Sequence, residues 1–131
     1  MVKVIIGNKG SGKTKWLIAQ VNAAAEQSHG NVVCLEQVRK LTTQISSRAR
    51  LIATMDYGIS GYDAFYGFLC GLCAGNYDIT DVFVDATLRI GGRDYNALCA
   101  FLQKVSKLDA NFFFTISAGS DELPQEILSF V

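Results

Sequence analysis

The chain opens with VKVIIGNKGSGKT (residues 2–14), in which an apolar run passes directly into closely spaced glycines and a Lys-Thr pair. The apolar run at 2–6 is typical of a buried strand. Residues 16–26 carry apolar side chains at helical spacing and predict a helix. Glycine tolerates backbone conformations that other residues resist, so the segment between them favours a tight turn. The sequence therefore predicts a strand, a tight loop and a helix in succession.

Residues 7–14 fit the pattern G-x-x-x-x-G-K-[ST], which is the spacing of the phosphate-binding loop of nucleoside triphosphatases. Backbone N–H groups in such a loop point at phosphate, and the following helix adds partial positive charge at its N-terminus. We expect Lys13 to reach the β- and γ-phosphates and the Thr14 hydroxyl to ligate Mg²⁺. The alternative is a glycine-rich turn that matches by chance, and the strand and helix around it argue against that. Nucleotide contacts are expected from Gly7, Asn8, Lys9, Gly10, Ser11, Gly12, Lys13, Thr14 and Lys15, with Lys9 and Lys15 either touching phosphate or remaining solvated.

The composition is that of a globular protein, with 131 residues of which 50% are hydrophobic and 18% charged. This length suits one domain, residues 1–131. No apolar run reaches the length of a membrane span, and the N-terminus leads into a strand rather than a signal peptide. These observations predict a cytoplasmic protein.

The net charge is zero, but the charges are unevenly spread. Residues 1–50 hold eight Lys and Arg against two Asp and Glu, and the remaining residues hold four against ten. Outside the glycine-rich loop, the basic excess could meet a polyanion or a neighbouring subunit, or it could form a solvated face. This basic cluster consists of Arg39, Lys40, Arg48 and Arg50.

The four cysteines include one C-x-x-C pair, Cys70 and Cys73. A zinc site needs four ligands, and only His29 could add to this pair. Because the pair lies in an apolar stretch, the sequence favours buried free thiols.

Strand and helix patterns alternate along the rest of the chain, which favours an α/β fold. We expect three α/β/α layers around about five mostly parallel strands. The remaining strands are predicted at 32–36, 51–55, 82–85 and 112–116, the helices at 62–73, 94–107 and 125–130, and loops at 58–61 and 90–93, while 38–50 follows no clear pattern.

Asp85 ends the apolar run at 82–84, which is the form of a Walker B strand. Because ligands bind beyond the carboxyl ends of parallel strands, Asp85 is expected near Thr14, where it would hold Mg²⁺. The alternative is an ordinary aspartate at a strand end. Ala86 follows, where many ATPases and the thymidine kinases with a zinc lasso carry a catalytic glutamate.

These residues make the chain resemble the ATP-binding core of RecA-like recombinases and hexameric helicases, over residues 1 to about 118. In that superfamily a water-activating glutamate ends the strand after the first helix, and Glu36 stands at that position. The resemblance implies the strand order 51–55, 32–36, 82–85, 112–117, 2–6. The DNA-binding loops of recombinases have no counterpart here, so nucleic acid is not indicated. The chain is also similar to short bacterial P-loop proteins labelled as twitching-motility ATPases.

The expected function is binding of ATP or GTP with Mg²⁺ and slow hydrolysis. Glu36 would orient water, Arg89 and Arg93 would supply positive charge in cis or from a neighbouring subunit of a homo-oligomer, and Ser117 or Ser120 would sense the γ-phosphate. Alternatively, nucleotide orders the loops 37–50 and 87–93 so that a protein partner docks. A third hypothesis is a small-molecule kinase with 37–50 as its lid. No base-reading signature such as N-K-x-D separates ATP from GTP.

Overall fold

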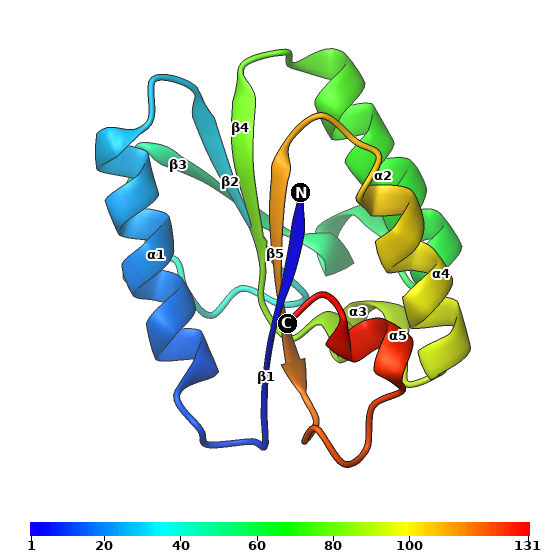
Figure 1. Cartoon of the computed structure of the whole chain (residues 1–131). Coiled ribbons are helices and arrows are strands. Elements are labelled where there is room, and N and C mark those ends of the chain that lie inside the picture. The colour runs from blue at the N-terminus through cyan, green and yellow to red at the C-terminus, as the bar shows by residue number, and fades with distance from the viewer.

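The computed structural model describes all 131 residues and shows a five-stranded parallel sheet with helices on both faces (Figure 1). The α/β fold class is therefore as predicted, and so is the layering. The elements are β1 (Val2–Gly7), α1 (Lys13–Gln27), β2 (Asn31–Glu36), β3 (Ala49–Ala53), a 3₁₀ turn η1 (Thr54–Tyr57), α2 (Tyr62–Gly75), β4 (Ile79–Val84), α3 (Thr87–Gly91), α4 (Tyr95–Val105), β5 (Asn111–Ser117) and α5 (Gln125–Leu128).

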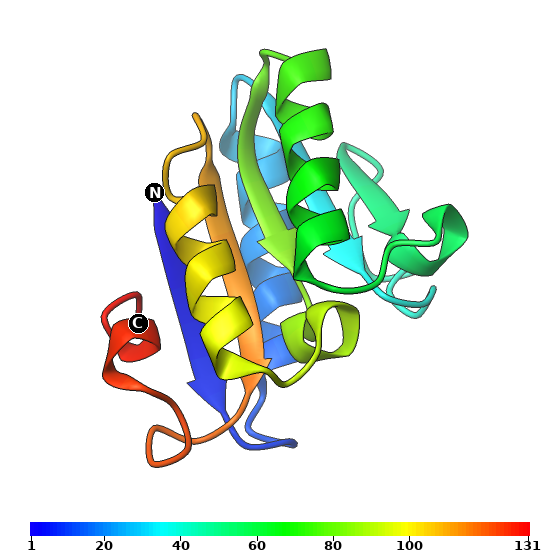
Figure 2. The same ribbon diagram turned by 90° about the vertical axis from the view of Figure 1, so that its right-hand side faces the viewer.

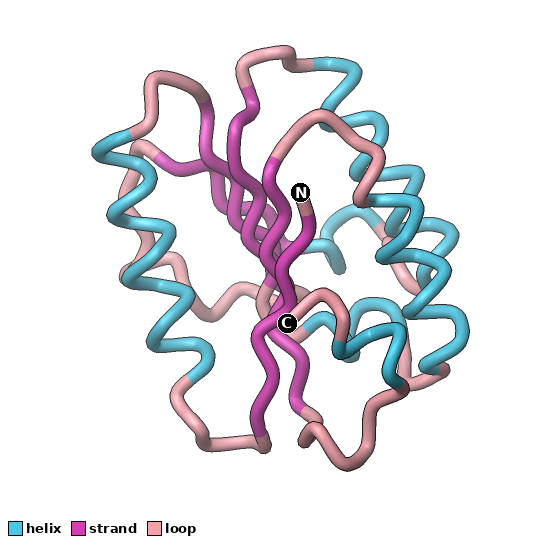
Figure 3. Tube along the Cα trace, in the orientation of Figure 1, coloured by secondary structure: helices cyan, strands magenta, loops and turns pink.

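The strand order is β3-β2-β4-β5-β1, which is the order implied by the resemblance to the RecA-like core. Every neighbouring pair is parallel. All five carboxyl ends therefore meet at one end of the molecule, and the loops that follow β1, β2 and β4 gather there (Figure 3). This end brings together segments that are far apart in the chain.

Two hydrophobic cores hold the layers. One face is covered by α1 (Figures 1 and 2). Its Leu17 and Val21 pack against β2 and β4. On the other face α2, α3 and α4 cover the sheet with a larger cluster. The apolar residues of α4 recur at helical spacing and face this cluster, so that Leu98, Phe101 and Val105 are buried.

Several boundaries differ from the sequence prediction, including the start of β4, which lies at Ile79 rather than at residue 82. The strand expected at 51–55 begins two residues earlier and ends at Ala53, because its register with β2 pairs Ala49 with Val32. The loop expected at 90–93 is wrong in part, since 87–91 forms α3. Its Leu88 and Ile90 are buried, but five residues are too few to show a helical period. The unassigned 38–48 consists of turns that pack Leu41 and Ile45 under α1.

The cysteines are all free, as predicted, but only Cys34 is buried. Burial raises the pKa of the Cys34 thiol to about 12. Cys70 and Cys73 are half-exposed, which contradicts the prediction that they are buried. The reason is their position on α2, where the helix turns part of each side chain away from the sheet.

Candidate functional site

The glycine-rich loop between β1 and α1 presents a row of unpaired backbone donors. The N–H of Ser11 bonds to the carbonyl of Asn8 at 3.1 Å, and that is the only backbone bond donated within 8–15. No group of the chain accepts from the other N–H groups of 8–15, and no side chain caps α1. Such donors need an external acceptor, and a compact anion supplies one.

Two glycines allow the concave shape of this loop. Gly12 has φ +91°, in the left-handed region, and it begins α1. At Gly7 a Cβ would collide with the side chain of Ser11. The loop therefore keeps its narrow concave form because these positions lack side chains.

Lys13 folds back over the loop. Its Nζ donates to the carbonyls of Gly7 at 2.8 Å and Asn8 at 3.1 Å, and to Ser11 Oγ at 3.3 Å. Burial lowers the pKa of Lys13, while the Asp85 carboxylate acts in the opposite direction. The ammonium thus lies over the unpaired amides and within electrostatic range of Asp85.

Thr14 and Asp85 meet across 71 residues of chain. The Thr14 hydroxyl lies 3.2 Å from both carboxylate oxygens of Asp85. Asp85 follows β4 directly, and its N–H continues the ladder by donating to Leu35 at 2.9 Å. The expected juxtaposition of these two side chains is therefore present.

Thr115 of β5 holds the Asp85 carboxylate in place. The sequence patterns did not indicate this threonine as part of the site. Its hydroxyl donates to Asp85 Oδ1 at 2.9 Å and accepts from the N–H of Ala86 at 2.9 Å. Ala86 is the one non-glycine residue with positive φ, +55°. A signal was available, since Thr115 is a hydroxyl residue within an otherwise apolar run.

Glu36 lies on β2, adjacent to β4, and is only 4% exposed. Its carboxylate accepts from the N–H of Lys40 at 2.9 Å and of Leu41 at 3.3 Å. It lines the same cleft as Lys13 and Asp85. In this structure Glu36 therefore anchors the turn at 37–41 as well as facing the cleft.

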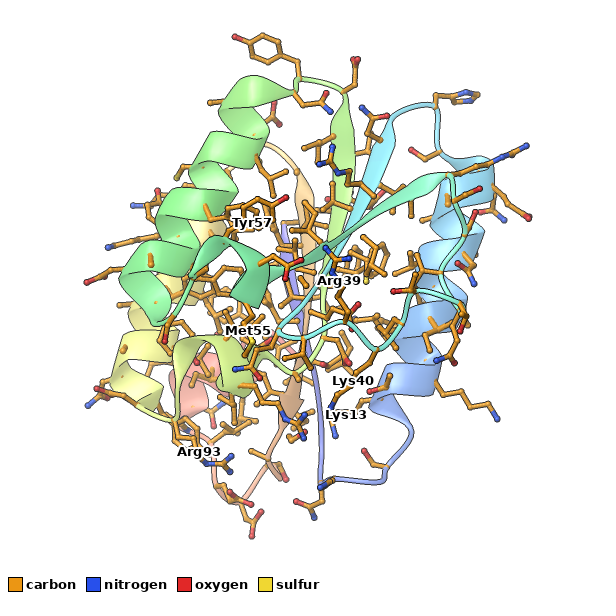
Figure 4. All side chains as sticks on the ribbon, turned by 180° about the vertical axis from the view of Figure 1, so that it is seen from behind. Lys13, Arg39, Lys40, Met55, Tyr57 and Arg93 are labelled. Atoms are coloured by element: carbon orange, nitrogen blue, oxygen red, sulfur yellow. The ribbon has the colours of Figure 1, made fainter.

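A cleft of about 420 Å³ joins these groups at the carboxyl end of the sheet. Lys9 and Lys15 line it, and Figure 4 shows Lys13 and Lys40 at the same end of the molecule. Arg89 also lines the cleft, whereas Arg93 lines only the neighbouring pocket. Of the two candidate serines, Ser117 lines the cleft and Ser120 does not.

The four residues of the basic cluster lie in three different environments. Lys40 faces the cleft. Arg39 forms an ion pair with Asp56 at 2.6 Å and is well exposed. Arg48 and Arg50 line a groove between β3 and α2.

The oxygen donors present fit a magnesium ion. Mg²⁺ binds one or two carboxylates together with substrate phosphates and water, rather than an all-protein cage. Thr14 and Asp85 offer a hydroxyl and a carboxylate that could share one ion. No group of three or more His, Cys, Asp or Glu side chains that could hold a metal ion gathers anywhere in the structure.

No protein-family model matches this chain, and no curated protein matches it either. None of its helices is both long and apolar enough to cross a lipid bilayer. The function is therefore argued from the site alone.

Proposed function

We propose that this protein is a P-loop nucleotide-binding protein of the RecA-like kind, which binds ATP or GTP with Mg²⁺ and hydrolyses it slowly. The observation that carries the proposal is the set of unpaired N–H groups at 8–15, with Lys13 above them and the Thr14–Asp85 pair beside them. These groups come from distant parts of the chain and lie around one cleft.

Each group has a defined task in this proposal. The loop amides and the start of α1 bind the phosphates, because they offer donors without competing acceptors. Lys13 exchanges its carbonyl partners for phosphate oxygens through its flexible stem. Thr14 and Asp85 would hold Mg²⁺, which would neutralise phosphate charge. Arg89, which lines the cleft, is the proposed cation for the terminal phosphate.

Glu36 is the proposed base that orients water. Its carboxylate already accepts from the N–H groups of Lys40 and Leu41, so it holds one orientation but has fewer free lone pairs for a water molecule. This arrangement supports slow turnover.

The same contacts support a second candidate, a nucleotide-dependent switch. Glu36 holds the turn at 37–41, and Gln37 Nε2 donates to the carbonyl of Arg89 at 3.0 Å. A terminal phosphate that attracts Arg89, or repels the Glu36 carboxylate, would therefore move both loops that frame the cleft. Under this reading a partner docks and little phosphate is released.

The test is the thermal shift produced by Mg-ATP. A ligand that binds only the native state raises the melting temperature, so the wild type should gain several degrees at saturating Mg-ATP. Lys13→Ala should remove the gain. Lys107→Ala, an exposed lysine before β5 at the opposite end of the sheet, should retain it. An unchanged shift in Lys13→Ala would refute the assignment of the loop.

Phosphate release then separates the two candidates. A slow hydrolase releases phosphate in proportion to protein and time. A switch binds Mg-ATP with the same dependence on Lys13 and releases almost none.

A further inference from the structure

A second cavity adjoins the nucleotide cleft. It has a volume of about 510 Å³ and lies beyond the carboxyl ends of β4 and β5. Four of its residues also line the cleft, so the two spaces are continuous. Its lining consists of Lys9, Ala86, Leu88, Arg89, Arg93 and Ser117. We call it the arginine pocket.

The arginine pocket has cations without counterions. Lys9, Arg89 and Arg93 line it, and no acidic residue does. The single ion pair of the chain is Arg39 with Asp56, so none of these three cations is paired. Three unpaired cations around one cavity attract an anion.

Asp94, the acidic residue next to Arg93 in the sequence, is engaged in other hydrogen bonds. The Asp94 side chain caps α4 by accepting from the N–H groups of Asn96 at 3.0 Å and Ala97 at 3.2 Å. These bonds keep the Asp94 carboxylate on the helix, and the guanidinium of Arg93 forms no ion pair. The exposed charge of Arg93 therefore does not serve the packing of α4.

The segment that carries both arginines is held firmly. Leu88 and Ile90 are buried in the core, so Arg89 between them is turned outward. The carbonyl of Ile90 accepts from the N–H of Gly61 at 3.0 Å, and that of Gly92 accepts from the Tyr62 hydroxyl at 2.7 Å. A rigid backbone under two guanidinium groups is pre-organised for a ligand.

We propose that the arginine pocket binds a small organic anion, carrying a phosphate or carboxylate group, beside the terminal phosphate of the nucleotide. Guanidinium groups match the planar, paired oxygens of these anions. The volume lies within the range of small-molecule sites. The cations surround one cavity rather than follow a stripe, which favours a small molecule over a nucleic-acid backbone. The position of the anion beside nucleotide rests on the proposed function, whereas the pocket itself does not.

Calorimetric titration tests this proposal. Orthophosphate would enter an empty phosphate loop, so the wild type is first saturated with Mg²⁺ and the non-hydrolysable analogue AMP-PNP. Orthophosphate and malonate are then titrated in separate arms, which distinguish phosphate from carboxylate ligands. We expect saturable binding of one anion per chain in at least one arm. Arg93→Gln should weaken it roughly tenfold or more, as expected for loss of a charge-assisted hydrogen bond.

The control is Arg48→Gln, which removes the same charge from an exposed arginine just before β3. It should bind the anion as the wild type does. Absence of saturable binding, equal affinity in Arg93→Gln and wild type, or equal weakening in both variants would each overturn the proposal. A short single-stranded oligonucleotide is then added as a competitor. If it displaces the anion, binds more tightly and loses affinity in Arg93→Gln, the pocket binds nucleic acid and the proposal is overturned.

The two proposals fail separately. If AMP-PNP does not stabilise the wild type, the nucleotide function is refuted. The same anions are then titrated without nucleotide into the wild type and Arg93→Gln. Binding that depends on Arg93 decides whether the arginine pocket binds an anion.

Discussion

At the residue scale, Asp85 depends on a hydroxyl from the neighbouring strand. Thr115 both donates to the carboxylate and accepts from the N–H of Ala86, the residue with φ +55°. Thr115 is 1% exposed, so water cannot replace either bond. One buried hydroxyl thus fixes the proposed metal ligand and the turn that leads into α3.

Thr115→Val tests this role because valine keeps the shape and removes the hydroxyl. We expect the free energy of unfolding to fall by about 1–3 kcal/mol, since the Ala86 N–H loses its buried acceptor. The Mg²⁺ concentration needed for half-maximal ATP binding should rise. Urea unfolding and magnesium titration measure the two effects. Thr115→Ser should restore both, and a serine variant as impaired as valine would contradict the hydrogen-bond explanation.

Glu36 combines a structural and a proposed catalytic role, and two substitutions separate them. Glu36→Gln keeps a carbonyl oxygen that can accept from Lys40 or Leu41, so the turn at 37–41 should stay protected in hydrogen exchange. Its phosphate release should be lost, because an amide is not a base. Glu36→Ala should lose both the protection of the turn and the phosphate release. Wild-type phosphate release in Glu36→Gln would place the base elsewhere.

At the element scale, α2 has glycines that its own packing does not require. Gly71 is exposed in the helix interior, and a Cβ there would meet open space. By contrast, a Cβ at Gly91 would collide with the ring of Tyr62. The same residue type is therefore dispensable in one helix and required in another.

Gly71→Ala should stabilise the protein by about 0.5–1 kcal/mol, because alanine loses less backbone entropy in a helix. Gly91→Ala is the matched control and should destabilise it, because the Tyr62 ring must move. Chemical denaturation measures both. A loss of stability in Gly71→Ala would show that this face of α2 needs its glycine.

Periodicity predicted the long helices, since α2 and α4 lie at the expected ranges 62–73 and 94–107. The strand order was implied by the family resemblance, and the sheet has that order. Periodicity could not predict α3, whose five residues are too short for a period. The start of β3 was missed because Arg50 is exposed on an edge strand and breaks the apolar pattern. At the site, the motif indicated Lys13 and Thr14, and the apolar run indicated Asp85. The amide partners of Glu36 and the bonds of Thr115 depend on tertiary contacts that no local pattern carries.

At the scale of the whole molecule, the last residues cover one edge of the sheet. β1 is the edge strand that leads into the phosphate loop, and the N–H of Val4 donates to the carbonyl of Phe130 at 2.9 Å. α5 lies beside β1 in Figure 2 and buries Ile127 completely. An open edge would offer its backbone groups to other chains, so the tail protects the strand that positions the site.

Ile127→Ala should loosen this cover. Loss of a buried isoleucine should lower the free energy of unfolding by about 2–5 kcal/mol. The control is Ile90→Ala, a similarly buried isoleucine in α3. Hydrogen exchange at Val4 should accelerate more in Ile127→Ala than in Ile90→Ala at equal global stability, because only the first variant detaches the tail locally. Equal protection of Val4 in both variants would mean that the tail opens only when the whole sheet does, and the edge of β1 would then owe its protection to global stability rather than to α5.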